Sequence, residues 1–191
     1  MMNTIKIAVK YPSFPMPVCL LGANVGGKPN FNTIAWFNVV DFQPDLIGIS
    51  SEKGHHTNKG IHENRTFSVN IPSTDMAVIT DYCGIYSGAE VDKSDIFEVF
   101  YGELKTAPMI RECPLNVECK LNRIVEFPHD EYIVGEIVEV HTEEKYVTNH
   151  KPDIEKISPL VFDPHNGYYW SLGERIAKAF DIGKTHRPKP K

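Results

Sequence analysis

Short apolar segments separated by turn signals fill the first two-thirds of the chain. Residues 115–122 alternate strictly between apolar and polar side chains, which is the pattern of a half-buried strand. Further strands are expected at residues 18–23, 31–42, 46–50, 66–71 and 132–142. Gly26-Gly27 suits a tight hairpin turn after the first of these strands, and Gly135 suits a bulge in the last.

Helical patterns are few and short. One begins at Thr57 and ends near Asn64, a second runs from Met76 to Cys83 with Gly84 as a stop, and a third covers Glu174 to Phe180. Because strands and helices do not alternate regularly, a mainly β fold with short helices, arranged as a barrel, is favoured over an open α/β sheet. Without a repeat or a break in composition, residues 1–191 are expected to form one domain.

Composition and charge exclude several classes of protein. The formal net charge of −5 argues against a nucleic-acid partner, and the basic run at residues 184–191 is interpreted as a solvated terminus. No segment has the roughly 20 apolar residues of a membrane span, and lysines interrupt the only apolar stretch near the start. Four cysteines without a C-x-x-C pair indicate free thiols and a cytoplasmic protein.

The common catalytic motifs are absent. The sequence has no phosphate-binding G-x-x-x-x-G-K-[ST] loop, no G-x-G-x-x-G dinucleotide turn and no G-x-S-x-G nucleophile elbow. Its eight histidines lack the spacing of a zinc site. We therefore predict neither a catalytic side chain nor a bound metal.

The segment Asn30 to Phe37 is the first candidate for ligand binding. A flat heteroaromatic ring needs polar groups along its edge and a close apolar wall along its face. Asn32 and Thr33 could supply the edge, Ala35 would permit close approach, and Trp36 could supply the wall. An ordinary aromatic core strand also explains this pattern and, from the residues alone, is the commoner case.

Two polar segments could bind a phosphate. Ser50 and Ser51 end a strand shortly before the helix that begins at Thr57, and hydroxyls near a helix N-terminus suit a phosphate dianion. A surface loop with a helix cap explains the same residues equally well. The loop Ser87 to Lys93 could bring a positive charge to a ligand, although an isolated lysine is usually just exposed.

Taken in order, these segments resemble the flavin reductase-like family, and within it the flavoredoxins. The resemblance covers nearly the whole chain. It rests on Pro17-Val18, Asn32 to Trp36, Ser50-Ser51, His56-Thr57, Phe67 to Asn70, Ser87-Gly88, Asp92-Lys93, Pro159 to Phe162 and Tyr169 to Glu174. The order and spacing of these segments, rather than any single motif, carry the resemblance.

The resemblance implies a split β-barrel that binds flavin mononucleotide (FMN) noncovalently, as a homodimer. The residues that would lie along the isoalloxazine and ribityl chain are Asn32, Thr33, Ile34, Ala35 and Trp36. Those that would hold the phosphate are Ser50, Ser51 and Thr57, and further flavin contacts are expected from Lys93, His129 and Phe162. With FMN as the redox group, no side-chain nucleophile is required.

The resemblance leaves two functions open. One is an electron carrier of the flavoredoxin type, with a redox protein as its donor or acceptor. The alternative is an NAD(P)H:flavin oxidoreductase that supplies reduced flavin. The missing dinucleotide turn does not decide between them, because barrel reductases can stack the nicotinamide directly on the flavin. A ligand-free interaction module is a third interpretation.

Overall fold

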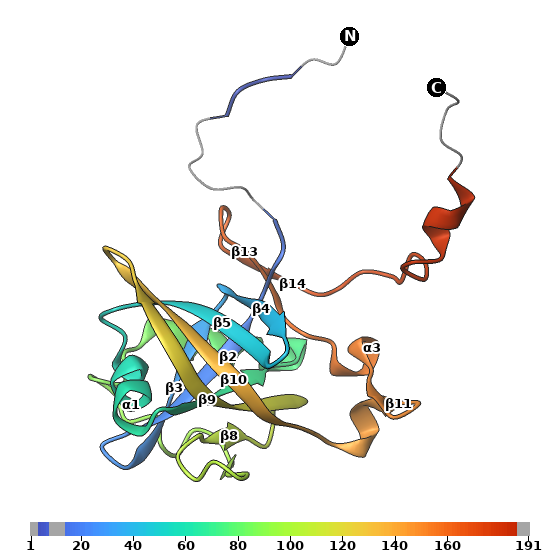
Figure 1. Cartoon of the computed structure of the whole chain (residues 1–191). Helices are drawn as coiled ribbons and strands as arrows, with labels where there is room; N and C mark the ends of the chain where they lie inside the picture. The colour runs from blue at the N-terminus through green and yellow to red at the C-terminus, as the bar shows by residue number, and fades with distance from the viewer. Residues whose placement is uncertain (1–3, 8–13, 187–191) are drawn as a thin grey trace.

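The computed structural model describes residues 4–7 and 14–186. Its centre is one antiparallel sheet with the strand order β3-β2-β6-β9-β10-β5-β4 (Figure 1). These strands are β2 (Cys19–Val25), β3 (Lys28–Ile34), β4 (Phe37–Phe42), β5 (Asp45–Glu52), β6 (Thr66–Ile71), β9 (Leu115–Glu126) and β10 (Asp130–Thr142). All six strands expected from the sequence are present, and the segment 31–42 is divided between β3 and β4.

The link between β3 and β4 forces the sheet to curl. These strands lie at opposite edges of the sheet, yet only Ala35 and Trp36 separate them in the chain. The three Cα–Cα steps from Ile34 to Phe37 span at most about 11 Å, so the edges must approach each other. We call this approach of β3 to β4 and β5 around Ala35 and Trp36 the seam. Here the amide of Ser50 donates to the main-chain oxygen of Trp36 over 2.8 Å. That bond continues the β4–β5 ladder beyond the Phe37–Ile49 pair, and within the described residues no strand pairing joins β3 to β4 or β5. The expected mainly β split barrel is confirmed, with β3 and β4 as its two unpaired edges.

The two glycine predictions also hold. Gly26 and Gly27 have φ values of 56° and 82°, the left-handed backbone that a tight β2–β3 hairpin requires. In β10 the register against β9 shifts between Val134 and Gly135. A Cβ at Gly135 would lie 2.3 Å from the ring of Phe67, so this position has no room for a side chain.

Helix α1 (His56–Asn64) packs on β2 and β6, and α2 (Ala77–Ile85) packs on β3 after the 3-10 turn η1 (Thr74–Met76). As expected, Met76, Ile79 and Cys83 share one buried face. Gly84 was expected to stop this helix, but α2 continues to Ile85. Gly84 instead faces β3, because a Cβ there would lie 3.3 Å from Cβ of Thr33.

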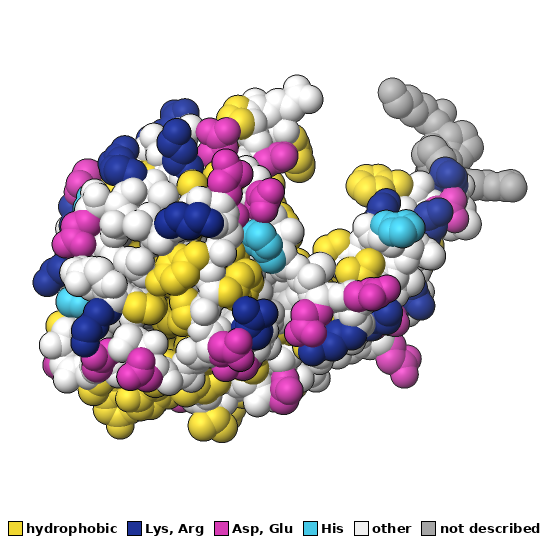
Figure 2. All heavy atoms as spheres, turned by 90° about the horizontal axis from the view of Figure 1, so that it is seen from below, with side chains coloured by type: hydrophobic (Ala, Val, Ile, Leu, Met, Phe, Trp, Pro, Cys, Tyr) yellow, Lys and Arg dark blue, Asp and Glu magenta, His cyan; other side chains and the backbone are white. Residues whose placement is uncertain are grey.

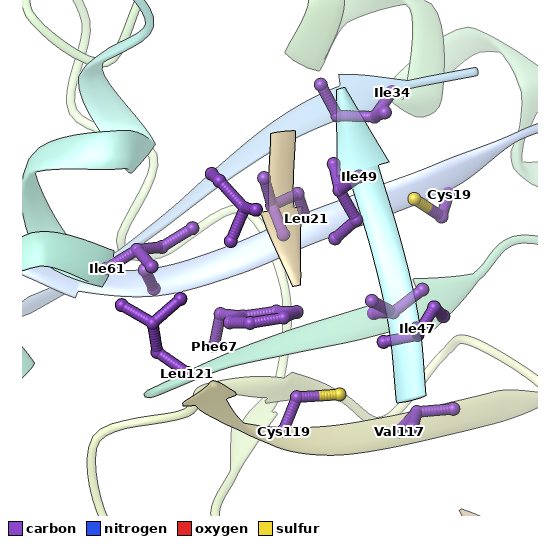
Figure 3. Close-up of a cluster of buried hydrophobic side chains, with 13 residues drawn as sticks. Cys19, Leu21, Ile34, Ile47, Ile49, Ile61, Phe67, Val117, Cys119 and Leu121 are labelled. Atoms are coloured by element: carbon purple, nitrogen blue, oxygen red, sulfur yellow. The ribbon is translucent and has the colours of Figure 1, made fainter. Parts of the chain in front are cut away.

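The barrel interior is apolar and closely packed. Figure 3 shows side chains from several strands and from α1 meeting around Phe67, and Phe67, Ile49 and Ile61 are fully buried. A second cluster around Phe31 lies under α2. All four cysteines are free and buried, as predicted for core thiols.

Shorter elements complete the described chain. A three-stranded sheet contains β1 (Met16–Pro17), β13 (Val161–Asp163) and β14 (Tyr168–Trp170). The remaining elements are the hairpins β7 (Val99–Phe100) with β8 (Met109–Ile110) and β11 (Val147–Thr148) with β12 (Lys151–Pro152), the turn η2 (Glu144–Tyr146) and α3 (Ile154–Ile157). Within residues 4–7 and 14–186, no helix combines the length and apolar character of a membrane span.

The expected helix from Glu174 to Phe180 is wrong. Residues 171–186, which we call the C-terminal arm, extend from the body with one 3-10 turn, η3 (Ile182–Thr185) (Figures 1 and 2). Ile176 and Phe180 are 95% and 98% exposed, so among residues 4–7 and 14–186 their apolar stripe packs on nothing. A helix this short needs such packing to form. Of the basic run, residues 187–191 lie outside the described part of the chain.

Candidate functional site

A cavity of about 310 Å³ opens at the seam of the barrel. The β3–β4 link forms one wall and β5 another, with the start of β10, α2 and the β13–β14 hairpin around them. Its lining residues are Val18, Thr33, Ile34, Ala35, Trp36, Ser50, Glu52, His55, Gly84, Asp130, Phe162 and Tyr169. Most of this surface is apolar, and the half-exposed Trp36 offers an aromatic face, which suits a planar ring.

The first cavity continues into a more polar region. A second cavity of about 290 Å³ shares Glu52, His55 and Gly84 with it. Further lining comes from the start of α1, the end of α2 and the loop after α2, including Asn32, His56, Thr57, Ser87, Gly88 and Lys93. A third cavity of about 210 Å³ adjoins the second at His56, Gly88 and Lys93. Together they form a cleft with an apolar end and a polar end.

Buried polar atoms without partners mark the polar end. Asn32 is 9% exposed, and neither its Nδ2 nor Nδ1 of His56 has a hydrogen-bond partner in the described part of the chain. Both residues line the second cavity. A buried polar atom left unsatisfied costs roughly 1–3 kcal/mol, so these atoms fit a ligand that offers hydrogen bonds at this end of the cleft.

Nine of the eleven residues expected to bind a cofactor line this cleft. Thr33, Ile34, Ala35, Trp36, Ser50 and Phe162 line the first cavity, and Asn32, Thr57 and Lys93 line the second. Ser51 is buried and faces α1, where its hydroxyl lies 2.8 Å from Oδ1 of Asn58. His129 is exposed in the β9–β10 turn, and its neighbour Asp130 lines the cavity instead.

Lys93 is more buried than an ordinary surface lysine. Its ammonium donates to the main-chain oxygens of Phe31 and Cys83, at 3.0 and 2.8 Å. Burial lowers the pKa of Lys93, and the Cys83 thiol opposes that shift. An ammonium has three donors. Two are used within the protein, which leaves one for a ligand in the second cavity.

Thr57 lies inside α1 rather than at its cap. The N-cap is His55, and the Thr57 hydroxyl accepts a hydrogen bond of 2.7 Å from Nδ2 of Asn30. Its side chain is 1% exposed, so it forms part of the cleft floor. The first amides of α1 nevertheless lie at the polar end of the cleft, where a helix N-terminus favours an anion.

Four polar residues of the first cavity were not among the cofactor contacts expected from the sequence: Glu52, His55, Asp130 and Tyr169. The Tyr169 hydroxyl donates to Asp81 over 3.0 Å, and burial, together with this carboxylate, raises the pKa of Tyr169 to about 12. Asp130 and Tyr169 come from separate hairpins, so no local spacing predicts that they meet. His55 lies within a segment already considered for phosphate binding, between Ser51 and Thr57.

Residues 11–170 match the flavin reductase like domain, which is more than half of the chain. The chain belongs to the flavin reductase-like family. Among solved structures, it resembles the flavoredoxin from Methanosarcina acetivorans at 48% identity, over 96% of this chain and 98% of that one, with a TM-score of 0.93. The flavoredoxin of Desulfovibrio vulgaris (Miyazaki F) is 33% identical over 94% and 99% of the two chains, with a TM-score of 0.88.

A relative is also found in Archaeoglobus fulgidus, at 31% identity over 143 residues, which is 74% of this chain and 80% of that protein. The flavin reductase-like family and its split-barrel fold, expected from the order of the sequence segments, are thereby confirmed. Both flavoredoxins align with nearly the whole chain.

Proposed function

We propose that this protein binds FMN in the cleft and transfers electrons through it, as a carrier of the flavoredoxin type. The observation that carries the proposal is the continuous cleft, with the indole of Trp36 at its apolar end and Asn32, His56 and Lys93 at its polar end. A flavin phosphate has the same division into a flat aromatic part and an anionic tail. The 48% identity to a flavoredoxin supports the same ligand.

The described residues fit this cofactor. Trp36 and Phe162 would contact the ring system, and Thr33 lies where its polar edge can reach it. Ser50, expected at the phosphate, lines the first cavity rather than the polar end and would also face the ring. At the other end, the first amides of α1 and the free donor of Lys93 would hold the phosphate. Bound FMN would supply the redox chemistry, because a flavin accepts and donates electrons itself. The protein orients it and limits its contact with water.

We also propose a homodimer. The C-terminal arm exposes Leu172, Ile176, Phe180 and Ile182, and Figure 2 shows hydrophobic side chains along it as it stands away from the body. Beside the arm, an apolar cavity of about 390 Å³ includes Phe14 and Trp170 and shares Phe162 with the first cavity. Apolar surface of this extent marks an interaction site, and a second copy would cover it next to the cofactor cleft.

The cytoplasm is the compartment we propose, because four free, buried thiols are typical of a reducing environment. Partners there would be a redox protein that donates or accepts electrons. Supply of reduced flavin from NAD(P)H is the competing function. The net charge of −5 argues against a nucleic-acid partner in either case.

The visible spectrum of the purified protein tests the cofactor, and isothermal titration with FMN and riboflavin tests the polar end. We expect flavin absorption bands and clearly tighter binding of FMN. Trp36→Ala should weaken FMN binding about five- to tenfold through loss of the aromatic wall. The matched control is Phe42→Ala, an exposed aromatic of β4 outside the cavity lining. Equal affinity for riboflavin and FMN would contradict the proposal that the polar end binds the phosphate.

Steady-state assays with NADH and NADPH separate the two functions. A carrier should oxidise either nicotinamide slowly and should be reduced quickly by a low-potential redox protein. Rapid turnover with a nicotinamide, together with release of reduced flavin, would establish the reductase instead.

A further inference from the structure

His55 borders both the first and the second cavity, and its ring is tied to a buried polar chain. Nδ1 of His55 lies 3.0 Å from Oγ of Ser51. That hydroxyl lies 2.8 Å from Oδ1 of Asn58, and Nδ2 of Asn58 lies 2.9 Å from Oε1 of Glu131. The chain ends at His62, whose Nε2 is 2.8 Å from the other carboxylate oxygen of Glu131.

The direction of each hydrogen bond follows from donor chemistry. Nδ2 of Asn58 also lies 3.0 Å from the main-chain oxygen of Glu52, and a carbonyl oxygen can only accept. The orientation of the amide is therefore fixed, and Oδ1 must face Ser51 as an acceptor. The Ser51 hydroxyl then donates its single hydrogen to Asn58, so its oxygen must accept a hydrogen bond from Nδ1–H of His55.

This makes His55 a donor at Nδ1. A neutral imidazole with its proton on Nδ1 carries a lone pair on Nε2. The pKa of His55 lies below its usual range because burial and the charge of Lys93 outweigh the carboxylates of Glu52 and Asp130, so the ring is neutral at pH 7. Within the described part of the chain Nε2 has no hydrogen-bond partner, and Ser51, which holds the other nitrogen, lines neither cavity.

We propose that His55 is a ligand-binding residue whose Nε2 accepts a hydrogen bond from an N–H or O–H group of the molecule in the cleft, with Ser51 and Asn58 as positioning residues that fix its tautomer. Because the ligand is taken to be FMN, the proposal rests on the proposed function. Two parts of a flavin carry such donors: the ring system with its N–H group, and the ribityl chain with its hydroxyls.

The tautomer is tested in flavin-free protein by long-range ¹H–¹⁵N correlation NMR of histidine-labelled samples. We expect His55 protonated on Nδ1 and unprotonated on Nε2 at pH 7. Ser51→Ala should abolish this preference. The matched control Ser73→Ala should preserve it, since that hydroxyl donates to Asp75, remote from His55 in the hydrogen-bond chain of the described residues. A proton on Nε2 in the wild type would overturn the proposal, and this measurement decides even if S51A does not fold.

The acceptor role is tested by titrating FMN into variants of His55. His55→Phe keeps a ring but no acceptor, and its FMN affinity should fall about five- to tenfold. His55→Gln places an amide oxygen near the position of Nε2 and should stay within about twofold of the wild type. Equal FMN affinity for H55F and wild type would overturn the proposal. Far-ultraviolet circular dichroism of each variant confirms that the barrel is folded.

Lumiflavin, which lacks the ribityl chain and phosphate, distinguishes the two sources of the donor. If H55F weakens lumiflavin and FMN by the same factor, the ring donates to His55. If only FMN is weakened, the ribityl chain donates. Failure of the wild-type protein to bind FMN would overturn the proposed function and the ligand assigned to His55. The tautomer result would still stand, so the two failures can be told apart.

Discussion

The ammonium of Lys93 lies 2.8 Å from the main-chain oxygen of Cys83, one of the last carbonyls of helix α2. The final four carbonyls of a helix lack partners within it, and the negative end of the helix dipole favours a cation there. A second bond of 3.0 Å joins the same ammonium to Phe31 in β3. Through these two hydrogen bonds Lys93 connects α2 to the sheet at the edge of the cofactor cleft.

Lys93→Met should lower the free energy of unfolding by about 1–3 kcal/mol, because it leaves two buried carbonyl groups without their donor. Methionine keeps most of the side-chain volume, so the change isolates the hydrogen bonds. Urea denaturation measures the effect. Lys59→Met, at an exposed position of α1, is the control and should change stability by less than about 0.5 kcal/mol. Equal midpoints for the two variants would contradict this role.

Gly135→Ala should destabilise the barrel by about 1–3 kcal/mol, because the new methyl group would lie 2.3 Å from the ring of Phe67. Gly183→Ala is the matched control, since a Cβ there meets no atom within 4 Å. Thermal unfolding of both variants measures the difference. A melting temperature for G135A equal to that of the wild type would show that Phe67 can move aside.

Glu118 should make stability depend on acid pH. Its carboxylate is buried and accepts from the amides of Glu103 and Leu104, at 3.0 and 2.7 Å, and from His141. Burial alone would raise the pKa of Glu118, but these donors outweigh burial and lower it. A folded-state pKa below the unfolded value of about 4.3 gives a stabilisation that is complete above that pH and lost as pH falls through the folded pKa.

Glu118→Gln should therefore be less stable than the wild type at pH 7. As pH falls below about 4.3, the variant should lose less stability than the wild type. Urea denaturation at several pH values measures this difference. The control is Glu144→Gln, at an exposed position, which should follow the wild-type pH curve. Parallel curves for wild type and E118Q would refute the assignment.

The double substitution Ile176→Asp and Phe180→Asp should convert the proposed dimer to a monomer at micromolar concentration. The reason is that both side chains are almost fully exposed in the single chain, and charges there would have to be buried against the second copy. Sedimentation velocity gives the result. Lys178→Asp, on the same arm, controls for added negative charge. A wild-type protein that sediments as a monomer at this concentration would contradict the proposed dimer.

Local patterns predicted most of the barrel. The alternation in residues 115–122 and the Gly26-Gly27 turn report directly on neighbouring backbone, so β9 and the β2–β3 hairpin follow from short segments. The helix expected in the C-terminal arm was wrong because its formation does not depend on local sequence alone. Its apolar spacing at Ile176 and Phe180 fits a helix, but a helix of that length depends on a surface to pack against, which local spacing cannot reveal.

From the residues themselves the site was predictable where one segment carries it, whereas Phe162 was expected only through the family resemblance. Thr33 to Trp36 are contiguous, and they form one wall of the first cavity. Asp130, Phe162 and Tyr169 reach the same cavity from two hairpins distant in sequence. Ser50 and Ser51 are neighbours in β5, and successive side chains of a strand point to opposite faces. Ser50 therefore faces the cavity, whereas Ser51 faces away from it. The role of Ser51 in orienting His55 depends on the helix that follows.

The seam at Ala35 and Trp36 has a consequence for how the barrel opens. Within the described residues β3 has no strand pairing with β4 or β5, and the bond from Ser50 to Trp36 belongs to the β4–β5 ladder, so separation of β3 from β5 would break few contacts. A molecule in the first cavity would contact both β3 and β5, and it would therefore hold these two strands together. Amide hydrogen exchange around residues 33–37 and 48–52 should therefore slow when the cleft is filled, while exchange in the β9–β10 centre stays unchanged.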